Sequence, residues 1–253
     1  MHRPVFFPQH RNHRPRSLVA LVFLACTSVA VFSPVVLGGR FFGLADPGVQ
    51  IYPALAFFAR YLREYGEVPL WNPLILSGQP LYLSSSATVG GFFYPIQLLY
   101  AVFEVLPLYH WLLVAYFILA AWCTFAVSRS MHLSISASTI AACAATFNQF
   151  TFAWGINNIN YYVFWILPAL LWILLRMDAL AAHRPPTQTH SPRFPLSWVL
   201  LLFGGTLTIG LSLLAGHPQF ILYALTAAAL ASLFLDIRRA RAVPPYRRGF
   251  HLT

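Results

Sequence analysis

Long apolar runs separated by short polar segments dominate the chain. A helix needs roughly 20 mostly apolar residues to cross a bilayer, and six runs approach that length. They are residues 18–37, 108–128, 135–155, 162–177, 197–216 and 218–235. The last two meet at AGHPQF, where Pro218 favours a break because proline lacks the backbone N–H that a helix needs. The pattern predicts an all-α, polytopic membrane protein with about six transmembrane helices.

The first apolar run has a second interpretation. The SVA before Val31 resembles a signal-peptide cleavage site, and a basic segment precedes the run. The run nevertheless stays apolar to Leu37, which is longer than the apolar region of about 7–15 residues in a signal peptide. We therefore predict an uncleaved first helix.

The first two predicted spans enclose the largest loop, at about residues 38–107. From Val49 to Tyr65, apolar residues recur three or four positions apart and charged residues interrupt them. This segment is expected to form an amphipathic helix lying at the membrane face. The apolar residues are Ile51, Leu55, Phe58 and Leu62, and the charged ones are Arg60, Arg63 and Glu64.

A second apolar stretch in the loop, GFFYPIQLLYAVFEVLP, is interrupted by Pro95 and Glu104. Proline and a charge inside such a stretch favour a re-entrant or interfacial helix. A seventh span is the alternative. It would move every later loop to the opposite side of the membrane, so the distribution of charge decides between the two.

Composition and charge support a membrane location and indicate the topology. Hydrophobic residues make up 58% of the chain and charged residues 9%, whereas soluble domains carry about 25% charged residues. The net charge of +10 comes from sixteen arginines and no lysine. With six spans and a cytoplasmic N-terminus, thirteen arginines fall on the cytoplasmic side and only Arg40, Arg60 and Arg63 outside, as the positive-inside rule requires.

This topology places both termini in the cytoplasm and divides the chain into three parts. They are a basic cytoplasmic N-terminus (1–17), a transmembrane domain (18–235) with its outer loop, and an Arg-rich cytoplasmic tail (236–253).

Asp46 is the first of only six acidic residues and follows the first predicted span directly. It precedes PGVQ, where aspartate is a good helix N-cap and proline is favoured at the next position. The same carboxylate, held within hydrogen-bond reach of a hydroxyl, would act as a general base or would ligate a metal. Gln50 lies one helical turn further and would face the same way. The local pattern leaves the cap and the site both open.

The three arginines expected outside, Arg40, Arg60 and Arg63, are candidates for binding phosphate. Guanidinium groups hold phosphate oxygens in a bidentate manner. Snorkelling of each side chain to lipid headgroups is the alternative. Their position near Asp46, in a compartment with no other arginine, makes a phosphate site worth testing.

His217 and Gln219 lie in AGHPQF, at the outer end of the fifth predicted span. An imidazole there would bind phosphate or donate a proton, and a polar break in a helical hairpin is the alternative. Asn148 and Gln149, inside the third run, are expected to hydrogen-bond between helices. The chain has no HExxH, GxSxG, P-loop or dinucleotide motif, so soluble-enzyme chemistry has no support.

Four segments carry a family resemblance: LADPGVQIYP, VPLWNPLILSGQPLY, FFYPIQLLY and LAGHPQFILY. In order and approximate spacing they resemble the bacterial YfhO-type membrane proteins, over most of the chain from Phe42 to about Tyr223. Members of that family are similar to GT-C glycosyltransferases, which are polytopic and use polyprenyl-phosphate sugars as donors. The WNP and GHPQ elements are the more specific part of the resemblance.

The resemblance implies a membrane glycosyltransferase of the bacterial inner membrane, acting on an acceptor of the cell envelope at the extracytoplasmic face. Asp46 falls where the superfamily carries a catalytic acidic residue, and Asn72 of the WNP element becomes a candidate for substrate binding. YfhO-type proteins are much longer, so this chain is expected to be a truncated part of such an enzyme. A divalent metal stays open as a cofactor, although no second acidic residue lies near Asp46.

Two other functions remain as alternatives. A transporter or flippase for a lipid-linked intermediate would line its path with polar residues at membrane depth, whereas here the acidic and amide residues cluster at the outer rim. A non-catalytic membrane fragment is the third interpretation, and the shortness of the chain relative to the family favours it. A basic net charge often indicates binding to nucleic acid, but here the arginines lie between apolar runs, so membrane topology explains them better and no nucleic-acid partner is expected.

Overall fold

Helices make up most of the protein, as the sequence predicted. The computed structural model describes residues 14–41, 47–74, 77–80, 95–157, 164–182, 195–214 and 218–242. The first elements are α1 (Arg14–Val31), α2 (Ser33–Val36), the π-helical turn η1 (Pro47–Ile51) and α3 (Tyr52–Tyr65). The short strands β1 (Trp71–Asn72) and β2 (Gln79–Pro80) and the 3-10 helix η3 (Pro95–Ala101) follow. The remaining helices are α4 (Val105–Ser130), α5 (Ile135–Thr146), α6 (Gln149–Asn157), α7 (Ile166–Ala182), α8 (Leu196–Leu214) and α9 (Pro218–Ala242).

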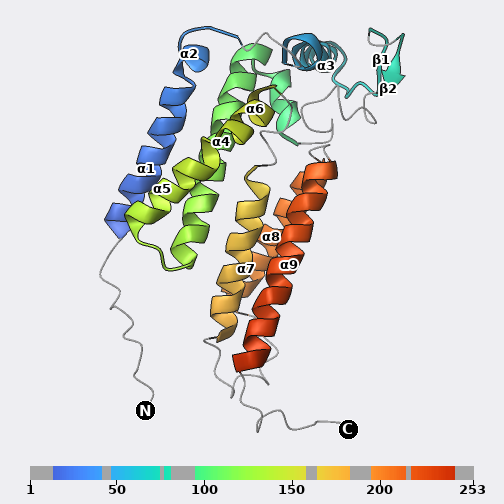
Figure 1. Ribbon diagram of the computed structural model, residues 1–253. Coiled ribbons are helices and arrows are strands. Elements are labelled where there is room, and N and C mark those ends of the chain that lie inside the picture. The colour runs from blue at the N-terminus through green and yellow to red at the C-terminus, as the bar shows by residue number, and fades with distance from the viewer. Residues whose placement is uncertain are drawn as a thin grey trace, which may run out of the picture.

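The helix α4 is the centre of a bundle. It packs against α1 and α5 on one side and against α7 on the other, and α8 and α9 pack on α7. In Figure 1, α2 and α3 lie at one end of the bundle, which we call the upper end. The beginning of α1, the turn between α4 and α5, and the last turns of α7 and α9 lie at the opposite, lower end.

Three helices are long and apolar enough to cross a membrane. They are Val105–Ser130, Leu196–Leu214 and Gln219–Arg241, with mean hydropathies of 1.9, 1.8 and 2.0. The apolar helices Pro15–Val31 and Ile135–Thr146 are shorter. The helices thus fit a membrane protein, and the number of six spans stays a prediction.

The third predicted span is interrupted at Asn148. Its Oδ1 accepts a hydrogen bond from the backbone N–H of Thr151 at 2.9 Å, and its Nδ2 donates to the carbonyl of Ala145 at 2.8 Å. The first bond is that of a helix N-cap, so Asn148 ends the run of α5 and starts α6. The expected hydrogen bond between helices is therefore replaced by a local one.

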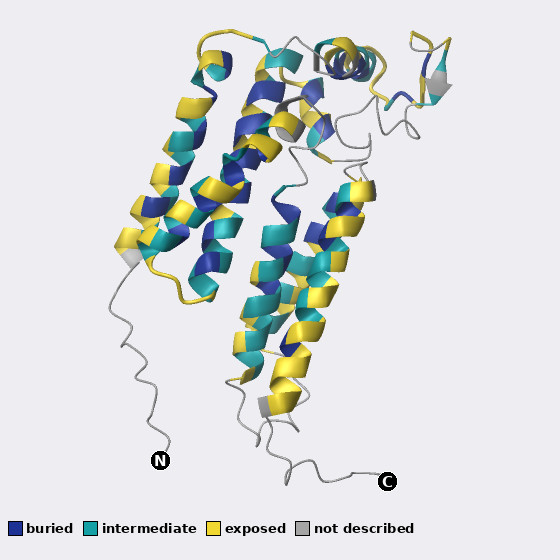
Figure 2. Cartoon of the chain, in the orientation of Figure 1, coloured by how far each residue is buried: buried dark blue, intermediate teal, exposed yellow. Residues whose placement is uncertain are grey.

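The outer helices expose apolar side chains to the surroundings. Only 11% of the most apolar window of α8 and 17% of that of α9 are buried inside the protein, compared with 44% for α4. Figure 2 shows exposed residues along the outer face of α9, whose other side packs on α7. A helix that is apolar on its exposed face needs an apolar solvent, which favours a bilayer around this part of the bundle.

Aromatic rings pack together where α1, α4 and α6 meet. The ring of Phe32 lies edge-on to Phe117, with centroids 4.8 Å apart, and stacks on Phe152 at 5.6 Å. Such pairs add about 0.5–1.5 kcal/mol beyond the area they bury. Phe32 lies between α1 and α2, so this contact fixes the start of α2 against the bundle.

The helix α3 lies across the upper end of the bundle, where Figure 1 shows it nearly end-on. It buries Ala54, Leu55, Phe58 and Ala59, while Arg60 and the residues after it are mostly exposed. Gly66 ends the helix with a φ of +71°, and its N–H donates to the carbonyl of Leu62 at 3.0 Å, as a left-handed C-terminal glycine does. The predicted amphipathic helix is therefore present, and its location on the outer side of a membrane stays a prediction.

Candidate functional site

Two residues of the predicted site lie outside the described residues, namely Asp46 and His217. Gln50 belongs to η1, and its side chain is not among those described. The proposed pair of Asp46 and Gln50 is therefore not tested by the structure. The chain on either side is nevertheless placed, because Asp46 is bonded to Pro47, the first residue of η1.

Phe41 fixes the chain before residues 42–46, as Pro47 does after them. Its ring lies 5.6 Å from that of Tyr52 at the start of α3 and 6.0 Å from that of His110 on α4. The chain on both sides of residues 42–46 is thus packed at the upper end of the bundle, beside the first turns of α4. His110 is buried, with 4% of its surface exposed.

The two arginines of α3 have different surroundings. Arg63 donates from Nε to the carbonyl of Ala101 at 3.1 Å and from Nη2 to the carbonyl of Phe103 at 2.6 Å. Arg60 is exposed, and no hydrogen bond or ion pair joins it to another described residue. Arg63 therefore holds the turn between η3 and α4 against α3, while Arg60 has its guanidinium available for a ligand.

Replacing Arg63 by alanine is expected to loosen this turn. Hydrogen bonds from charged groups contribute about 1.5–3 kcal/mol when they are buried. Because Arg63 is exposed, we expect a loss of about 1–2 kcal/mol for the pair. Arg60→Ala, one turn earlier on the same helix, is the matched control and should cost less than about 0.5 kcal/mol. Hydrogen exchange of residues 95–104 measures the effect, and equal exchange in the two variants would contradict the assignment.

Arg40, Asn72 and Gln219 also lie on elements of the upper end. Arg40 follows α2 and is exposed. Gln219, in the first turn of α9, donates from Nε2 to the hydroxyl of Tyr223 at 2.9 Å. The structure thus brings the elements that carry these candidates to one end of the bundle, and no side-chain contact between the candidates is seen among the described residues.

Asn72 has a local structural role in the β1–β2 hairpin. It is 1% exposed, and its Oδ1 accepts a hydrogen bond from the N–H of Leu74 at 2.9 Å, as an asparagine at a turn does. The hairpin also requires Gly78, which has a φ of +105° and whose added Cβ would lie 2.7 Å from the ring of Trp71. The WNP element therefore shapes the hairpin, and substrate binding by Asn72 stays a prediction.

Buried polar side chains near the upper end were not singled out in the sequence. Gln97 and Tyr100 of η3 are 4% and 0% exposed, and Trp165 before α7 is 8% exposed. Gln97 Oε1, Tyr100 OH and Trp165 Nε1 have no hydrogen-bond partner among the described residues. A buried polar group without a partner costs about 1–3 kcal/mol, so such groups are candidates for contact with a ligand.

The three-residue spacing of Gln97 and Tyr100 is the feature of the sequence from which this pair of polar side chains could have been found. Residues three apart in a 3-10 helix lie above one another, so both side chains of η3 point to the same side. The sequence predicted this stretch as a re-entrant or interfacial helix, with a seventh span as the alternative, and neither interpretation assigned a role to these two side chains. Burial above all, and then the neighbouring Tyr109, raise the pKa of Tyr100. Its phenol is therefore neutral at physiological pH and suited to donating a hydrogen bond.

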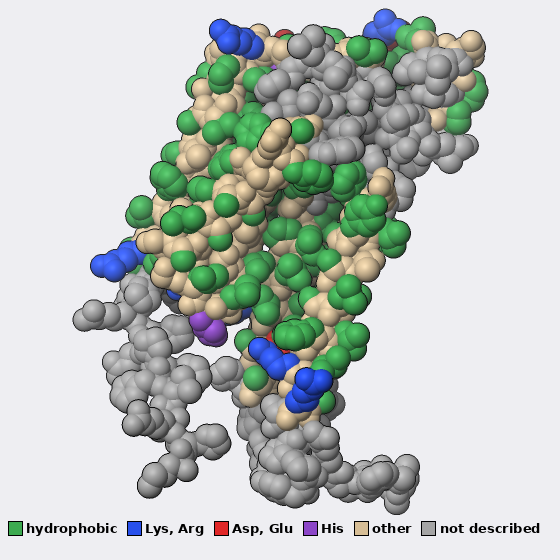
Figure 3. All heavy atoms as spheres, viewed as in Figure 1, with side chains coloured by type: hydrophobic (Ala, Val, Ile, Leu, Met, Phe, Trp, Pro, Cys, Tyr) green, Lys and Arg blue, Asp and Glu red, His purple; other side chains and the backbone are tan. Residues whose placement is uncertain are grey.

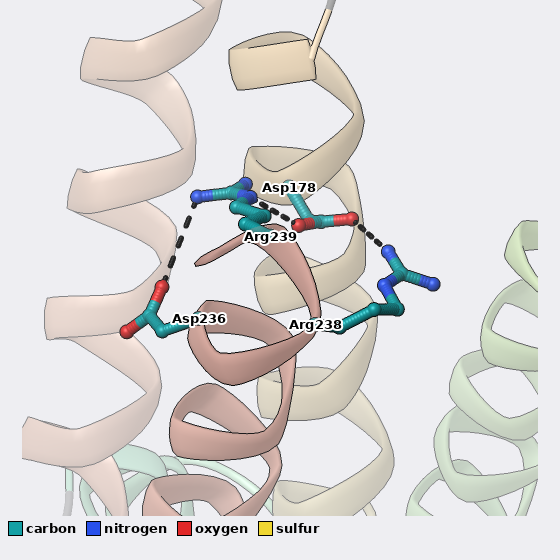
Figure 4. A network of polar contacts seen from close by, with 4 residues as sticks. All are labelled: Asp178, Asp236, Arg238 and Arg239. Atoms are coloured by element: carbon teal, nitrogen blue, oxygen red, sulfur yellow. Dashed lines mark hydrogen bonds and ion pairs between the residues drawn. The ribbon is translucent and has the colours of Figure 1, made fainter. Parts of the chain in front are cut away.

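The lower end holds a network of charges that the sequence analysis also missed (Figure 4). Asp178 of α7 contacts Arg238 of α9 at 2.7 Å through Oδ2 and Arg239 at 2.6 Å through Oδ1. Arg239 also lies 3.9 Å from Asp236. These contacts tie α7 to α9, which continues to Ala242, beyond its predicted end at residue 235.

The fold and the exposed apolar helices define an all-α protein of the membrane-associated class. Comparisons with protein-family models, with curated proteins and with solved structures gave no match. Among the described residues, no three His, Cys, Asp or Glu side chains lie together as ligands for a metal ion.

Proposed function

We propose that the protein is a membrane glycosyltransferase of GT-C type, which moves a sugar from a polyprenyl-phosphate donor to a cell-envelope acceptor. The observation that carries the proposal is the upper end of the bundle. There the amphipathic helix α3 presents Arg60 and packs against η3, in which the buried Gln97 Oε1 and Tyr100 OH have no hydrogen-bond partner among the described residues. A lipid-linked phosphate reaches protein at such an interface between bilayer and water.

The distribution of arginine supports the orientation needed for this reaction. Seven of the ten described arginines lie on elements of the lower end, and Arg40, Arg60 and Arg63 lie at the upper end. Figure 3 shows basic side chains at both ends and hydrophobic ones over the surface between them. The positive-inside rule places the richer end in the cytoplasm, so the upper end faces the extracytoplasmic side of what we propose is a bacterial inner membrane.

The proposed reaction assigns a step to each group. The Asp46 carboxylate accepts the proton of the acceptor hydroxyl as the acceptor oxygen bonds to the anomeric carbon of the sugar. The bond between that carbon and the phosphate oxygen breaks, and polyprenyl phosphate leaves as the anion. Arg60 and Arg40 would hold the phosphate oxygens, because guanidinium groups bind phosphate in a bidentate manner.

Incubating the purified protein with a radiolabelled polyprenyl-phosphate sugar tests the proposal. We expect saturable donor binding and transfer of the label to a hydroxyl acceptor. Binding should weaken in Arg60→Gln, because one phosphate contact is lost, and should stay unchanged in Arg176→Gln at the opposite end. Flux of the intact donor across liposomes without transfer would indicate a transporter instead. The absence of donor binding would refute both.

The orientation has its own test. A reporter fused after Gly66, at the end of α3, is expected to be active only outside the cytoplasm, and one fused after Arg241 only inside. The reason is the concentration of arginine at the lower end. A cytoplasmic signal from the Gly66 fusion would overturn the orientation and, with it, the assignment of the upper end to an extracytoplasmic reaction.

A further inference from the structure

A groove lies between α1 and α5 at the lower end of the bundle, remote from α3. Its volume is about 380 Å³. Both helices begin at this end (Figure 1), and they pack against each other along the groove. The lining includes Arg16, Ala20 and Phe23 from α1 and Ser136, Thr139 and Ile140 from α5.

Small residues form the floor of the groove and large apolar ones its rim. Ala20 is 7% exposed and belongs to a buried cluster with Leu24 and Ala142. Phe23 and Ile140 are 54% and 69% exposed on the two sides. A hollow with this lining, between two apolar helices, is complementary to the apolar surface of an acyl chain.

The lower end of the groove is basic and polar. Arg16 is exposed and lies in the first turns of α1. Ser136 lies in the first turn of α5, so both residues are at the level where the two helices begin. No acidic residue lines the groove. The charge of this end is therefore complementary to a phosphate group, and the partial positive charge at the two helix N-termini acts in the same direction.

We propose that this groove binds one anionic phospholipid. Its phosphate contacts the guanidinium of Arg16 and the hydroxyl of Ser136, and one acyl chain lies over Ala20 between Phe23 and Ile140. The helices α1 and α5 are both shorter than a full span. The lipid covers apolar surface in the groove between them that would otherwise be left uncovered. The proposal is independent of the glycosyl transfer proposed above, because the two sites lie at opposite ends of the bundle.

Native mass spectrometry of the delipidated protein in neutral detergent, titrated with phosphatidylglycerol, tests the proposal. We expect the first phosphatidylglycerol molecule to bind more tightly than any further phosphatidylglycerol molecules. It should also bind more tightly than phosphatidylcholine. Arg16→Gln should weaken this binding about fivefold, since each basic residue near an anionic surface contributes about that factor. Thr139→Phe fills the groove and should abolish the tight binding while leaving the helical circular dichroism unchanged. Arg241→Gln, in the last turn of α9 and away from the groove, should have no effect.

Three outcomes would overturn the proposal. Equal binding of phosphatidylcholine would mean that the phosphate is not recognised by charge. Full competition by soluble glycerol phosphate would mean that a free anion, rather than a lipid, occupies the basic end. An equal loss in Arg241→Gln and Arg16→Gln would mean that the lipid is attracted by the basic end of the bundle as a whole and not by the groove.

Discussion

Replacing Asp46 by asparagine is expected to lower the rate of sugar transfer by about 10²- to 10⁴-fold, the usual contribution of a positioned general base. Asparagine keeps the size of the side chain but has no carboxylate to accept the proton of the acceptor. Donor binding should persist, because the phosphate is held by arginine in the proposed reaction. Transfer and donor binding are measured separately with the radiolabelled donor.

The same substitution distinguishes the base from a helix cap. Asparagine caps a helix about as well as aspartate, so a capping Asp46 would leave turnover nearly normal after the change. Asp236→Asn is the matched control, because Asp236 is an exposed acid at the opposite end of the bundle, with 68% of its side chain accessible. Unchanged transfer by the Asp46→Asn protein would sink the catalytic assignment.

Replacing both Arg238 and Arg239 by glutamine is expected to destabilise the protein more than replacing Asp178 by asparagine. The side chain of Asp178 is 12% exposed, whereas those of the two arginines are 59% and 42% exposed. Without the arginines, a carboxylate that is mostly shielded from solvent is left unpaired, which costs up to about 3–5 kcal/mol. Without the carboxylate, both arginines still reach water, and the cost is about 1 kcal/mol or less.

Thermal unfolding in detergent, followed by circular dichroism, measures the difference. At about 2–4 °C per kcal/mol, the double arginine variant should melt roughly 6–20 °C lower than the parent. The triple variant, which also carries Asp178→Asn, should recover most of this loss, because no unpaired charge remains in it. Equal melting temperatures for the double variant and Asp178→Asn would show that burial of the carboxylate does not determine the stability of this contact.

The sequence predicted the helices better than the contacts between them. The length of the apolar runs located α4, α8 and α9, because a helix that crosses a bilayer needs an apolar solvent along its whole length. The spacing of apolar residues located the amphipathic α3, because burial of one face leaves a regular pattern. It did not show that Asn148 would cap α6 within the third run. An asparagine in an apolar segment is compatible both with a bond inside its own helix and with a bond to a neighbouring helix, and only the fold distinguishes them.

For the candidate site, the sequence likewise predicted which residues are polar but not which contacts they make. Arg60 and Arg63 look equivalent on the helical pattern, since both lie on the polar side of α3. Arg63 is occupied by carbonyls of Ala101 and Phe103, about 40 positions later in the chain, and local periodicity contains no information on such contacts. The pairing of Asp178 with Arg238 has the same origin, because 60 residues separate the partners.

The order in which the helices of the bundle are synthesised has a consequence for its assembly. The helices α1, α4, α5 and α6 precede all of α7, α8 and α9 in the chain, and the rings of Phe32, Phe117 and Phe152, which contact one another, all belong to this earlier part. Chains emerge at about 5–20 residues per second, so this aromatic core can close seconds before α7 leaves the ribosome. The face of α4 that later receives Ile166, Ala169 and Leu170 is exposed in the meantime. The nascent protein therefore passes through a stage at which this face is covered only by lipid or by the insertion machinery.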